Sequence, residues 1–158
     1  MKALFRLTPL VCLFVAVPMF AGIMDWNAAG CTGVVIPGSA AYTCIGPSIA
    51  FAATNIGTIT VRYPVVNTYG GAISKTPPWS RLEIGGAPNG GTITGTIIRV
   101  TECSATTLSL CTIPSVNACN ICSFSNGIDF ANYAYYVEVK LSRTSTSQDP
   151  RVHTVAVY

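Results

Sequence analysis

The chain has 158 residues and a formal net charge of +3; only 9% of its residues are charged, whereas 50% are hydrophobic. Roughly a quarter of an average soluble domain is charged, so most of this surface must be built from Thr, Ser, Asn and Gly. The abundant aliphatic and aromatic residues exclude intrinsic disorder. The small net charge argues against nucleic acid as a partner, because nucleic-acid-binding surfaces are strongly basic.

Residues 1–21 show the basic, apolar and small segments of a secretory signal peptide, in that order. Lys2 and Arg6 precede an apolar run that ends at Phe20, and Ala21 is the small residue before the expected cleavage site. The run has about 14 residues, whereas a membrane-spanning helix needs roughly 20. We therefore expect cleavage and export to the periplasm, the cell surface or the medium, with one domain at residues 22–158 and no membrane span in the mature protein.

Beyond residue 21 the sequence predicts short β-strands separated by turns. Clusters of glycine and proline mark turns, and they occur at 68–71, 75–78, 85–91 and 149–150. Apolar residues do not recur at helical spacing. In chain order, the expected strands are 42–53 (broken at Gly46-Pro47), 57–63, 81–84, 92–101, 108–113, 132–143 and 151–158.

The strand pattern is clearest in segment 132–143. Its residues Tyr135, Val137, Val139 and Leu141 fall on one face and the polar residues between them on the other. This period of two is typical of a half-buried antiparallel strand. Segment 57–63 alternates in the same way.

Segment 92–101 changes phase midway, with Ile93 and Ile97 on one face and Ile98 and Val100 on the other. A β-bulge or burial on both faces would explain this change. Short strands at this spacing predict an all-β fold. The expected fold is an antiparallel two-sheet sandwich, immunoglobulin-like or jelly-roll-like, with a small barrel as the second choice.

The mature chain keeps an even number of cysteines, which in an exported protein implies disulfide bonds. Their spacing favours three local pairs, while crossed pairing among the last four stays open. The expected pairs are Cys31–Cys44, Cys103–Cys111 and Cys119–Cys122.

The Cys119-Asn-Ile-Cys122 motif has two other interpretations. A redox dithiol needs a helix after its first cysteine, and Ser123 to Gly127 does not favour one. A zinc site formed with Cys103 and Cys111 would lack the second Cys-x-x-Cys of a zinc ribbon. Structural disulfides are therefore favoured over a metal site.

The sequence contains no recognisable catalytic motif, so we expect no enzyme and no cofactor. His153 is the single histidine, and no Gly-x-Ser-x-Gly nucleophile is present. A glycosidase needs two facing carboxylates, for which Glu83 and Glu138 are one pair. Lys140 lies on the same strand face as Glu138, where an ion pair is the commoner role.

Aromatic residues beside turn signals are the best candidates for ligand contacts. Trp79 follows Pro77-Pro78 and Tyr69 precedes Gly70-Gly71. Flat rings held at loop tips suit stacking on a sugar or contact with a protein. We expect Trp79, Arg81 and Tyr69 to form a ligand-binding patch, with Tyr133 and Tyr136 off the core face of their strand. The alternative is that Trp79 caps one end of the core.

Segment 132–143, followed by Asp149-Pro150 and preceded by Thr76-Pro-Pro-Trp79, is similar to a pattern found in small exported bacterial β-proteins of unknown function. The resemblance implies export and a β-fold. Its motifs are strand and turn patterns, so it implies no catalytic residue.

The sequence is compatible with two functions. The first is a non-catalytic binding or structural module of the cell envelope or extracellular medium, with a glycan or an envelope protein as partner. The second is a small secreted hydrolase, such as a glycosidase, that uses carboxylates. The absence of a catalytic motif favours the first.

The N-terminal pattern predicts that the exported protein starts near Gly22. Intact-mass measurement of the secreted protein should give a mass that lacks residues 1–21 or differs from that by a few residues. Recovery of the full chain with Met1 attached would contradict the prediction.

Overall fold

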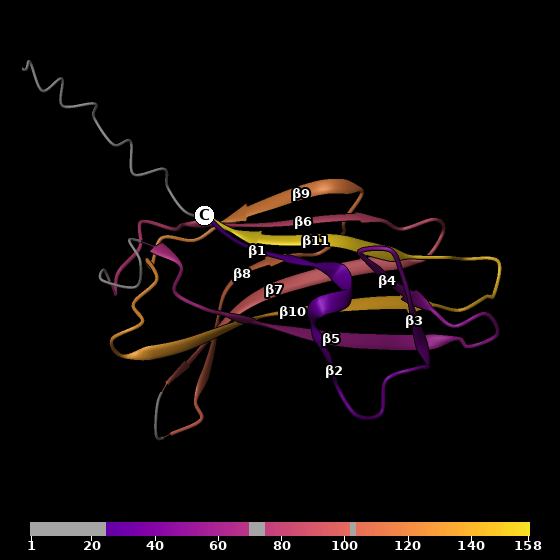
Figure 1. The fold of residues 1–158 in the computed structure, drawn as a ribbon, viewed down its shortest axis with the longest axis horizontal. Helices are drawn as coiled ribbons and strands as arrows, with labels where there is room; N and C mark the ends of the chain where they lie inside the picture. The colour runs from indigo at the N-terminus through magenta and orange to yellow at the C-terminus, as the bar shows by residue number, and fades with distance from the viewer. Residues whose placement is uncertain (1–24, 70–74, 102–103) are drawn as a thin grey trace, which may run out of the picture.

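The computed structural model describes residues 25–69, 75–101 and 104–158. Two antiparallel sheets pack face to face (Figure 1), which confirms the predicted two-sheet sandwich over the small barrel. The predicted signal peptide, the glycines at 70–71 and Cys103 lie outside the described residues.

The first sheet, sheet A, has six strands in the order β3-β4-β11-β6-β9, and β1 pairs with β11 beside β4. The 3-10 helix η1 (Gly30–Thr32) leads from β1 toward the other sheet. The strands of sheet A are β1 (Trp26–Ala29), β3 (Tyr42–Ile45), β4 (Ser48–Phe51), β6 (Arg81–Ala87), β9 (Ala118–Ser123) and β11 (Arg151–Val157).

The second sheet, sheet B, has five strands in the order β2-β5-β10-β7-β8. The long strand β10 lies at its centre and pairs with both β5 and β7. The strands are β2 (Val34–Val35), β5 (Gly57–Val65), β7 (Thr92–Thr101), β8 (Thr107–Ile113) and β10 (Tyr133–Arg143).

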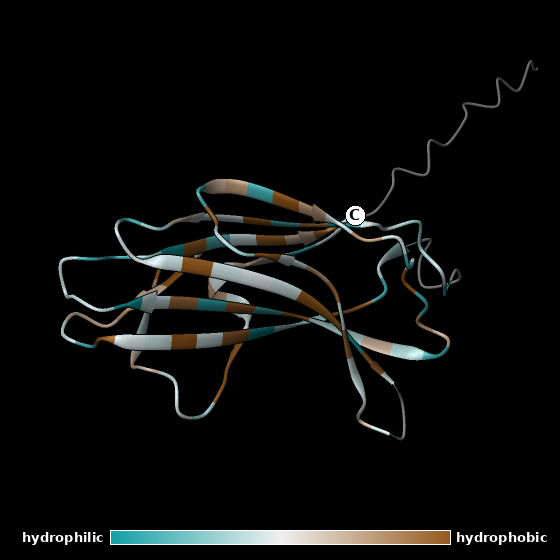
Figure 2. Ribbon diagram, turned by 180° about the vertical axis from the view of Figure 1, so that it is seen from behind, coloured by the Kyte–Doolittle hydropathy of each residue, from teal (hydrophilic) through white to brown (hydrophobic). Residues whose placement is uncertain are grey.

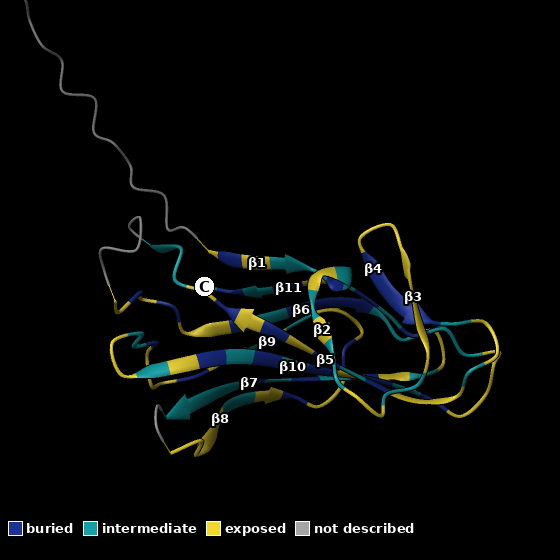
Figure 3. Ribbon diagram, turned by 60° about the horizontal axis from the view of Figure 1, so that its bottom comes forward, coloured by how far each residue is buried: buried dark blue, intermediate teal, exposed yellow. Residues whose placement is uncertain are grey.

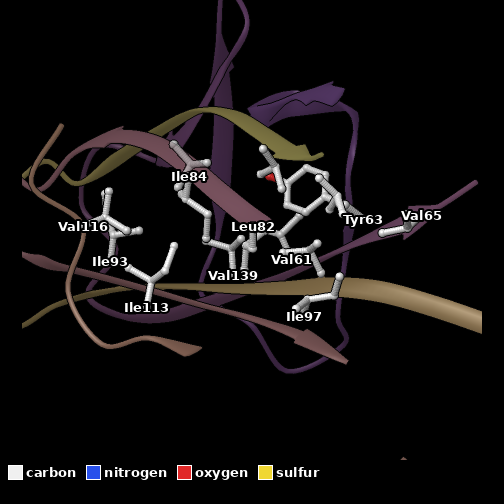
Figure 4. Packing of buried hydrophobic residues seen from close by; sticks show 14 of the residues in the cluster. Val61, Tyr63, Val65, Leu82, Ile84, Ile93, Ile97, Ile113, Val116 and Val139 are labelled. Atoms are coloured by element: carbon white, nitrogen blue, oxygen red, sulfur yellow. The ribbon is translucent and has the colours of Figure 1, made fainter. Parts of the chain in front are cut away.

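Alternation along each strand creates the core between the sheets. On β10, Val137, Val139 and Leu141 are fully buried, whereas the residues between them reach solvent (Figure 3). The same alternation appears as apolar and polar bands along the strands (Figure 2). Side chains from both sheets meet in one hydrophobic cluster (Figure 4). The predicted period of two is confirmed for this strand.

One glycine allows the sheets to approach closely. Gly95 of β7 faces inward, and a Cβ atom there would lie 1.9 Å from Cδ1 of Ile84 on sheet A. Any larger residue would therefore displace Ile84, which is fully buried.

The phase change predicted in segment 92–101 corresponds to apolar residues on both faces of β7. β7 pairs with β10 in unbroken register, so Ile93 and Ile97 face the core while Ile98 and Val100 face outward. A register shift between β7 and β8 at Ile97/Ile98 marks a β-bulge, but this bulge does not lie in segment 92–101, so it is not the cause of the phase change. The extra residue, Leu110, is on β8, and the outward isoleucine and valine stay half-buried on the sheet surface.

The disulfides correct two of the three expected pairs. Cys31–Cys44 is confirmed, but Cys111 bonds with Cys122 and so links β8 of sheet B to β9 of sheet A. Cys119 and Cys122 are three residues apart in one strand, so their side chains point to opposite faces and cannot pair. The disulfide also excludes Cys111 and Cys122 from a zinc site.

Arg143 at the end of β10 holds two loops against the sandwich. It is 5% exposed, and its guanidinium donates to the backbone oxygens of Ala52, Ala53, Asn55 and Gln148 at 2.6–3.2 Å. Its Cζ atom also lies 4.6 Å from the ring centroid of Phe51. These hydrogen bonds tie the backbone of the loop after β4 and of the loop before β11 to the end of β10.

The structure predicts that Cys119 reacts with a thiol reagent in the folded protein, because its side chain is exposed and has no disulfide partner among the described cysteines. Peptide mapping after alkylation under native conditions should find the label at Cys119, and none at the four bonded cysteines until a reductant is added. An unlabelled Cys119 would contradict the structure.

Candidate functional site

Trp79 is not at a loop tip, so that prediction is wrong and the alternative role as a core cap is confirmed. The side chain is 0% exposed and packs edge-to-face on Phe130, with ring centroids 6.1 Å apart. Ser80 and Arg81, the next residues, hydrogen-bond to the carbonyl of Tyr158, which ties the segment to sheet A and turns the indole inward. A fully buried ring cannot stack on a ligand.

Tyr69 and Arg81 do not join Trp79 in one patch. Tyr69 is half-buried and packs against the core, and Arg81 is exposed at the start of β6 on the outer side of sheet A. A ligand-binding role for either residue stays a prediction.

Tyr133 and Tyr136 of β10, both expected off the core face, lie on opposite faces of the strand. Tyr136 faces outward as expected, and the Arg62 guanidinium lies 4.9 Å from its ring centroid. Tyr133 has the parity of the buried Tyr135, so its expected position off the core face is wrong. It packs against the core and is covered by Arg99, whose Cζ atom is 4.1 Å from its ring centroid.

The carboxylates do not form the pair that a glycosidase needs. Glu83 of β6 and Glu138 of β10 are on the outer faces of opposite sheets, with the whole core between them. Glu83 accepts a hydrogen bond from the Tyr158 hydroxyl at 2.9 Å, which raises the pKa of Tyr158.

The neighbours of Glu138 favour the ionised form of its carboxyl group. Partial burial raises the pKa of its carboxyl, but hydrogen bonds from Arg62 and Lys140 outweigh this and hold the pKa below its ordinary value. The distances are 2.9 Å to Arg62 Nε and 3.2 Å to Lys140 Nζ. A general acid for glycoside hydrolysis needs a raised pKa, so Glu138 does not fit that role.

His153 contacts a serine without forming a triad. Its Nδ1 lies 2.6 Å from Oγ of Ser48, where β4 and β11 share a single backbone pair. Ser48 is 6% exposed, and among residues 25–69, 75–101 and 104–158 no carboxylate hydrogen-bonds to His153. The pair therefore lacks the third group that orients a catalytic histidine. A register shift between Val152 and Thr154 interrupts the alternation of β11 at His153.

Two further features are absent from the described part of the chain. Its His, Cys, Asp and Glu side chains form no group of three that could hold a metal ion. Its helical structure includes no segment long and apolar enough to cross a membrane.

The outer face of sheet B is an ordered polar surface, and we call it the hydroxyl face. Outward residues of the four neighbouring strands β5, β10, β7 and β8 line up in rows across it, because cross-strand partners share a face. Its hydroxyl side chains pair: Thr96 with Thr112 at 3.0 Å, and Thr58 with Ser142 at 2.9 Å. The hydroxyl residues are Thr58, Thr60, Thr92, Thr94, Thr96, Thr112 and Ser142.

Two adjacent rows on this face differ in chemistry. Arg62, Glu138 and Thr96 form one row, in which the ion pair is central. Pro64, Tyr136 and Ile98 form the next row, which is apolar; Pro64 is exposed, and Tyr136 and Ile98 are partly buried. Neighbouring strands are about 4.8 Å apart, so each row spans about 10 Å. A flat apolar strip thus lies beside a strip of hydrogen-bonding groups.

The sequence contained a signal for this surface. Threonine recurs at every second position in 92–96 and in 58–60, which places the hydroxyls on one face of each strand. Their alignment into rows depends on the register between strands 57–65, 92–101 and 133–143, which are far apart in the chain.

Comparison with known proteins finds distant structural similarity only. No family model matches the chain, and no curated protein matches it in sequence. The CBM36-1 domain of a multidomain xylanase from the hindgut metagenome of Trinervitermes trinervoides is similar over 85% of this chain and 97% of that domain, with 8% identity and a TM-score of 0.45.

Two other solved structures are similar to 85% of this chain. The carbohydrate-binding module CBM36 in complex with calcium and xylotriose has 15% identity and a TM-score of 0.42, with 99% of that chain covered. An exo-beta-1,3-galactanase from Phanerochaete chrysosporium has 9% identity and a TM-score of 0.40, with 29% of that chain covered. At these scores the similarities carry no functional argument.

Burial of Trp79 predicts a large loss of stability in the Trp79→Ala variant. Removing a fully buried Trp should lower the free energy of unfolding by about 3–5 kcal/mol, measured by denaturant or thermal unfolding. The control is Tyr42→Ala, which truncates a side chain that is 47% exposed. Equal stability of both variants would show that Trp79 is not part of the core.

Proposed function

We propose that this protein is a non-catalytic binding module of the cell envelope or extracellular medium, and that it binds a glycan on the hydroxyl face. The observation that carries the proposal is the row of Pro64, Tyr136 and Ile98 beside the row of Arg62, Glu138 and Thr96. Sugar rings present apolar C–H faces and hydroxyl edges, so an apolar strip next to hydrogen-bonding groups is complementary to them.

The ion pair gives the polar row defined donors and acceptors. Arg62 and Lys140 hold the Glu138 carboxylate in place, and this ionised group can accept hydrogen bonds from sugar hydroxyls. Arg62 also supports the Tyr136 ring. Because these groups are already ordered, little side-chain entropy is lost when a ligand binds.

The proposed location is supported by the two disulfides, since such bonds persist in oxidising compartments. The rival hydrolase has no comparable support, because Glu83 and Glu138 face away from each other and Glu138 is held as an anion. We therefore argue only the binding function.

The proposal predicts that Tyr136→Ala weakens glycan binding about tenfold, the equivalent of roughly 1.4 kcal/mol from one stacked ring. Binding of the mature protein to a panel of purified polysaccharides, measured by affinity electrophoresis and calorimetry, checks this. Tyr136→Phe should bind almost as well as the wild type, because the ring is kept.

Tyr42→Ala is the matched control, since it removes an exposed tyrosine from sheet A. It should bind normally, and thermal unfolding should show that both alanine variants are folded. Equal affinity of wild type and Tyr136→Ala for every polysaccharide that binds would refute the hydroxyl face as the site.

A further inference from the structure

A cleft opens at the side of the sandwich where the two sheets are not joined. Among the strands of the described chain, β1 is an edge of sheet A and β2 pairs only with Val61 and Arg62 of β5, so the end of β5 is an edge of sheet B. η1 carries the chain between the sheets beside this opening (Figure 1). The cleft has a volume of about 330 Å³ and is lined by Trp26, Asn27, Ala28, Ala29, Thr32, Tyr63 and Pro64.

The cleft combines aromatic walls with an unpaired donor. Trp26 is 6% exposed, and its indole N–H makes none of the hydrogen bonds found among the described residues. The N–H of Trp79 is also unpaired, but it is sealed in the core, whereas that of Trp26 reaches solvent. A buried indole usually has a partner for its N–H, so the cleft offers a donor to a ligand.

Three further polar side chains line the cleft. Asn27 is exposed, and its amide is unpaired in the described part of the chain. The Thr32 hydroxyl donates to the Ala29 carbonyl at 2.8 Å and keeps its acceptor capacity. The Tyr63 hydroxyl on the inner wall donates to the Gly30 carbonyl at 2.7 Å. Ala28 and Pro64 add apolar surface, so both ring stacking and hydrogen bonding are available.

The edge of β5 beside the cleft does not favour an added β-strand. The carbonyls of Thr58 and Thr60 point to this edge, where they accept from Ala40 and Ile36. By the same alternation the backbone of Pro64 points outward there, and a proline has no N–H to donate. β1, the opposite edge, is only four residues long. A small molecule therefore fits the cleft better than a peptide strand.

Pro64 connects the cleft with the hydroxyl face. It lines the cleft and is also the cross-strand partner of Tyr136. A chain that lies on the row of Pro64, Tyr136 and Ile98 and passes over β5 would therefore reach the cleft with its last ring.

We propose that the cleft binds a single sugar ring, and that this ring is the end of the glycan chain bound by the hydroxyl face. The link to the glycan chain on the hydroxyl face rests on the proposed function, whereas the binding of a sugar ring in the cleft does not. The Trp26 N–H donates to a ring hydroxyl, the faces of Trp26 and Pro64 contact the ring, and Asn27 binds at the rim. A volume of about 330 Å³ lies at the small end of the usual range for ligand sites.

The two tryptophans allow a direct test in the intact mature protein. Two-dimensional ¹H–¹⁵N spectra resolve indole N–H signals, and Trp26→Phe assigns them. Addition of glucose, galactose, mannose, xylose or N-acetylglucosamine at millimolar concentration should shift the Trp26 signal and leave that of Trp79 unchanged. If none of these sugars shifts the Trp26 signal, the proposal is overturned.

Variants separate binding from folding. Trp26→Phe should raise the Kd for the monosaccharide that binds about fivefold, as expected for the loss of one hydrogen bond, and Trp79→Phe should leave it unchanged. Should Trp26→Phe fail to fold, Asn27→Ala gives the same test at an exposed position. Unchanged affinity in Asn27→Ala and in a folded Trp26→Phe would overturn the proposal.

Oligosaccharides with a free or a chemically blocked end test the link to the hydroxyl face. Blocking the end should weaken binding to the wild type, with little effect in the Trp26→Phe variant. If Tyr136→Ala weakens oligosaccharide binding while the Trp26 signal does not move, the hydroxyl face stands and the cleft proposal fails. If monosaccharides shift Trp26 but Tyr136→Ala has no effect, the cleft stands and the proposed face fails.

Discussion

The alternation of side chains along β10 is the constraint on which both the core and the proposed binding surface depend. Val137, Val139 and Leu141 point to sheet A and are fully buried, so this strand cannot slip by one residue without exposing them. The same constraint forces Tyr136, Glu138 and Lys140 to the outer face. Packing of the core thus determines which residues are available to a ligand, and the pairing of β10 with β5 and β7 places Pro64 and Ile98 beside Tyr136.

The few charged residues of the described chain have specific structural positions. Arg143 satisfies carbonyls of two loops, Arg99 covers Tyr133, and Arg62 and Lys140 flank Glu138. On a surface so poor in charge, hydroxyl groups supply much of the hydrogen-bonding capacity. Paired threonines across strands order these hydroxyls, which reduces the entropy lost when they bind a polar ligand.

The two long sides of the sandwich differ. On one side Cys111–Cys122 joins β8 to β9 and ties the sheets together. On the other side the edges of β1 and the end of β5 stay apart, and the cleft lies between them. A disulfide lowers the entropy of the unfolded chain, with a typical gain of roughly 2–4 kcal/mol. Because the disulfide holds the two sheets together on its side of the sandwich, the opposite side can stay open.

The sequence by itself determined the fold class, the strands with clear alternation and the Cys31–Cys44 pair, because these depend on residues that are near one another in the chain. It did not determine that Trp79 is buried, since two prolines and a loop composition describe a segment but not the direction of its ring. Nor did it determine the Cys111–Cys122 bond, because β8 and β9 meet only when the two sheets pack. The row of Pro64, Tyr136 and Ile98 and the cleft at Trp26 likewise come from strand register and from the edges left unpaired, and these arise from contacts between segments that are distant in sequence.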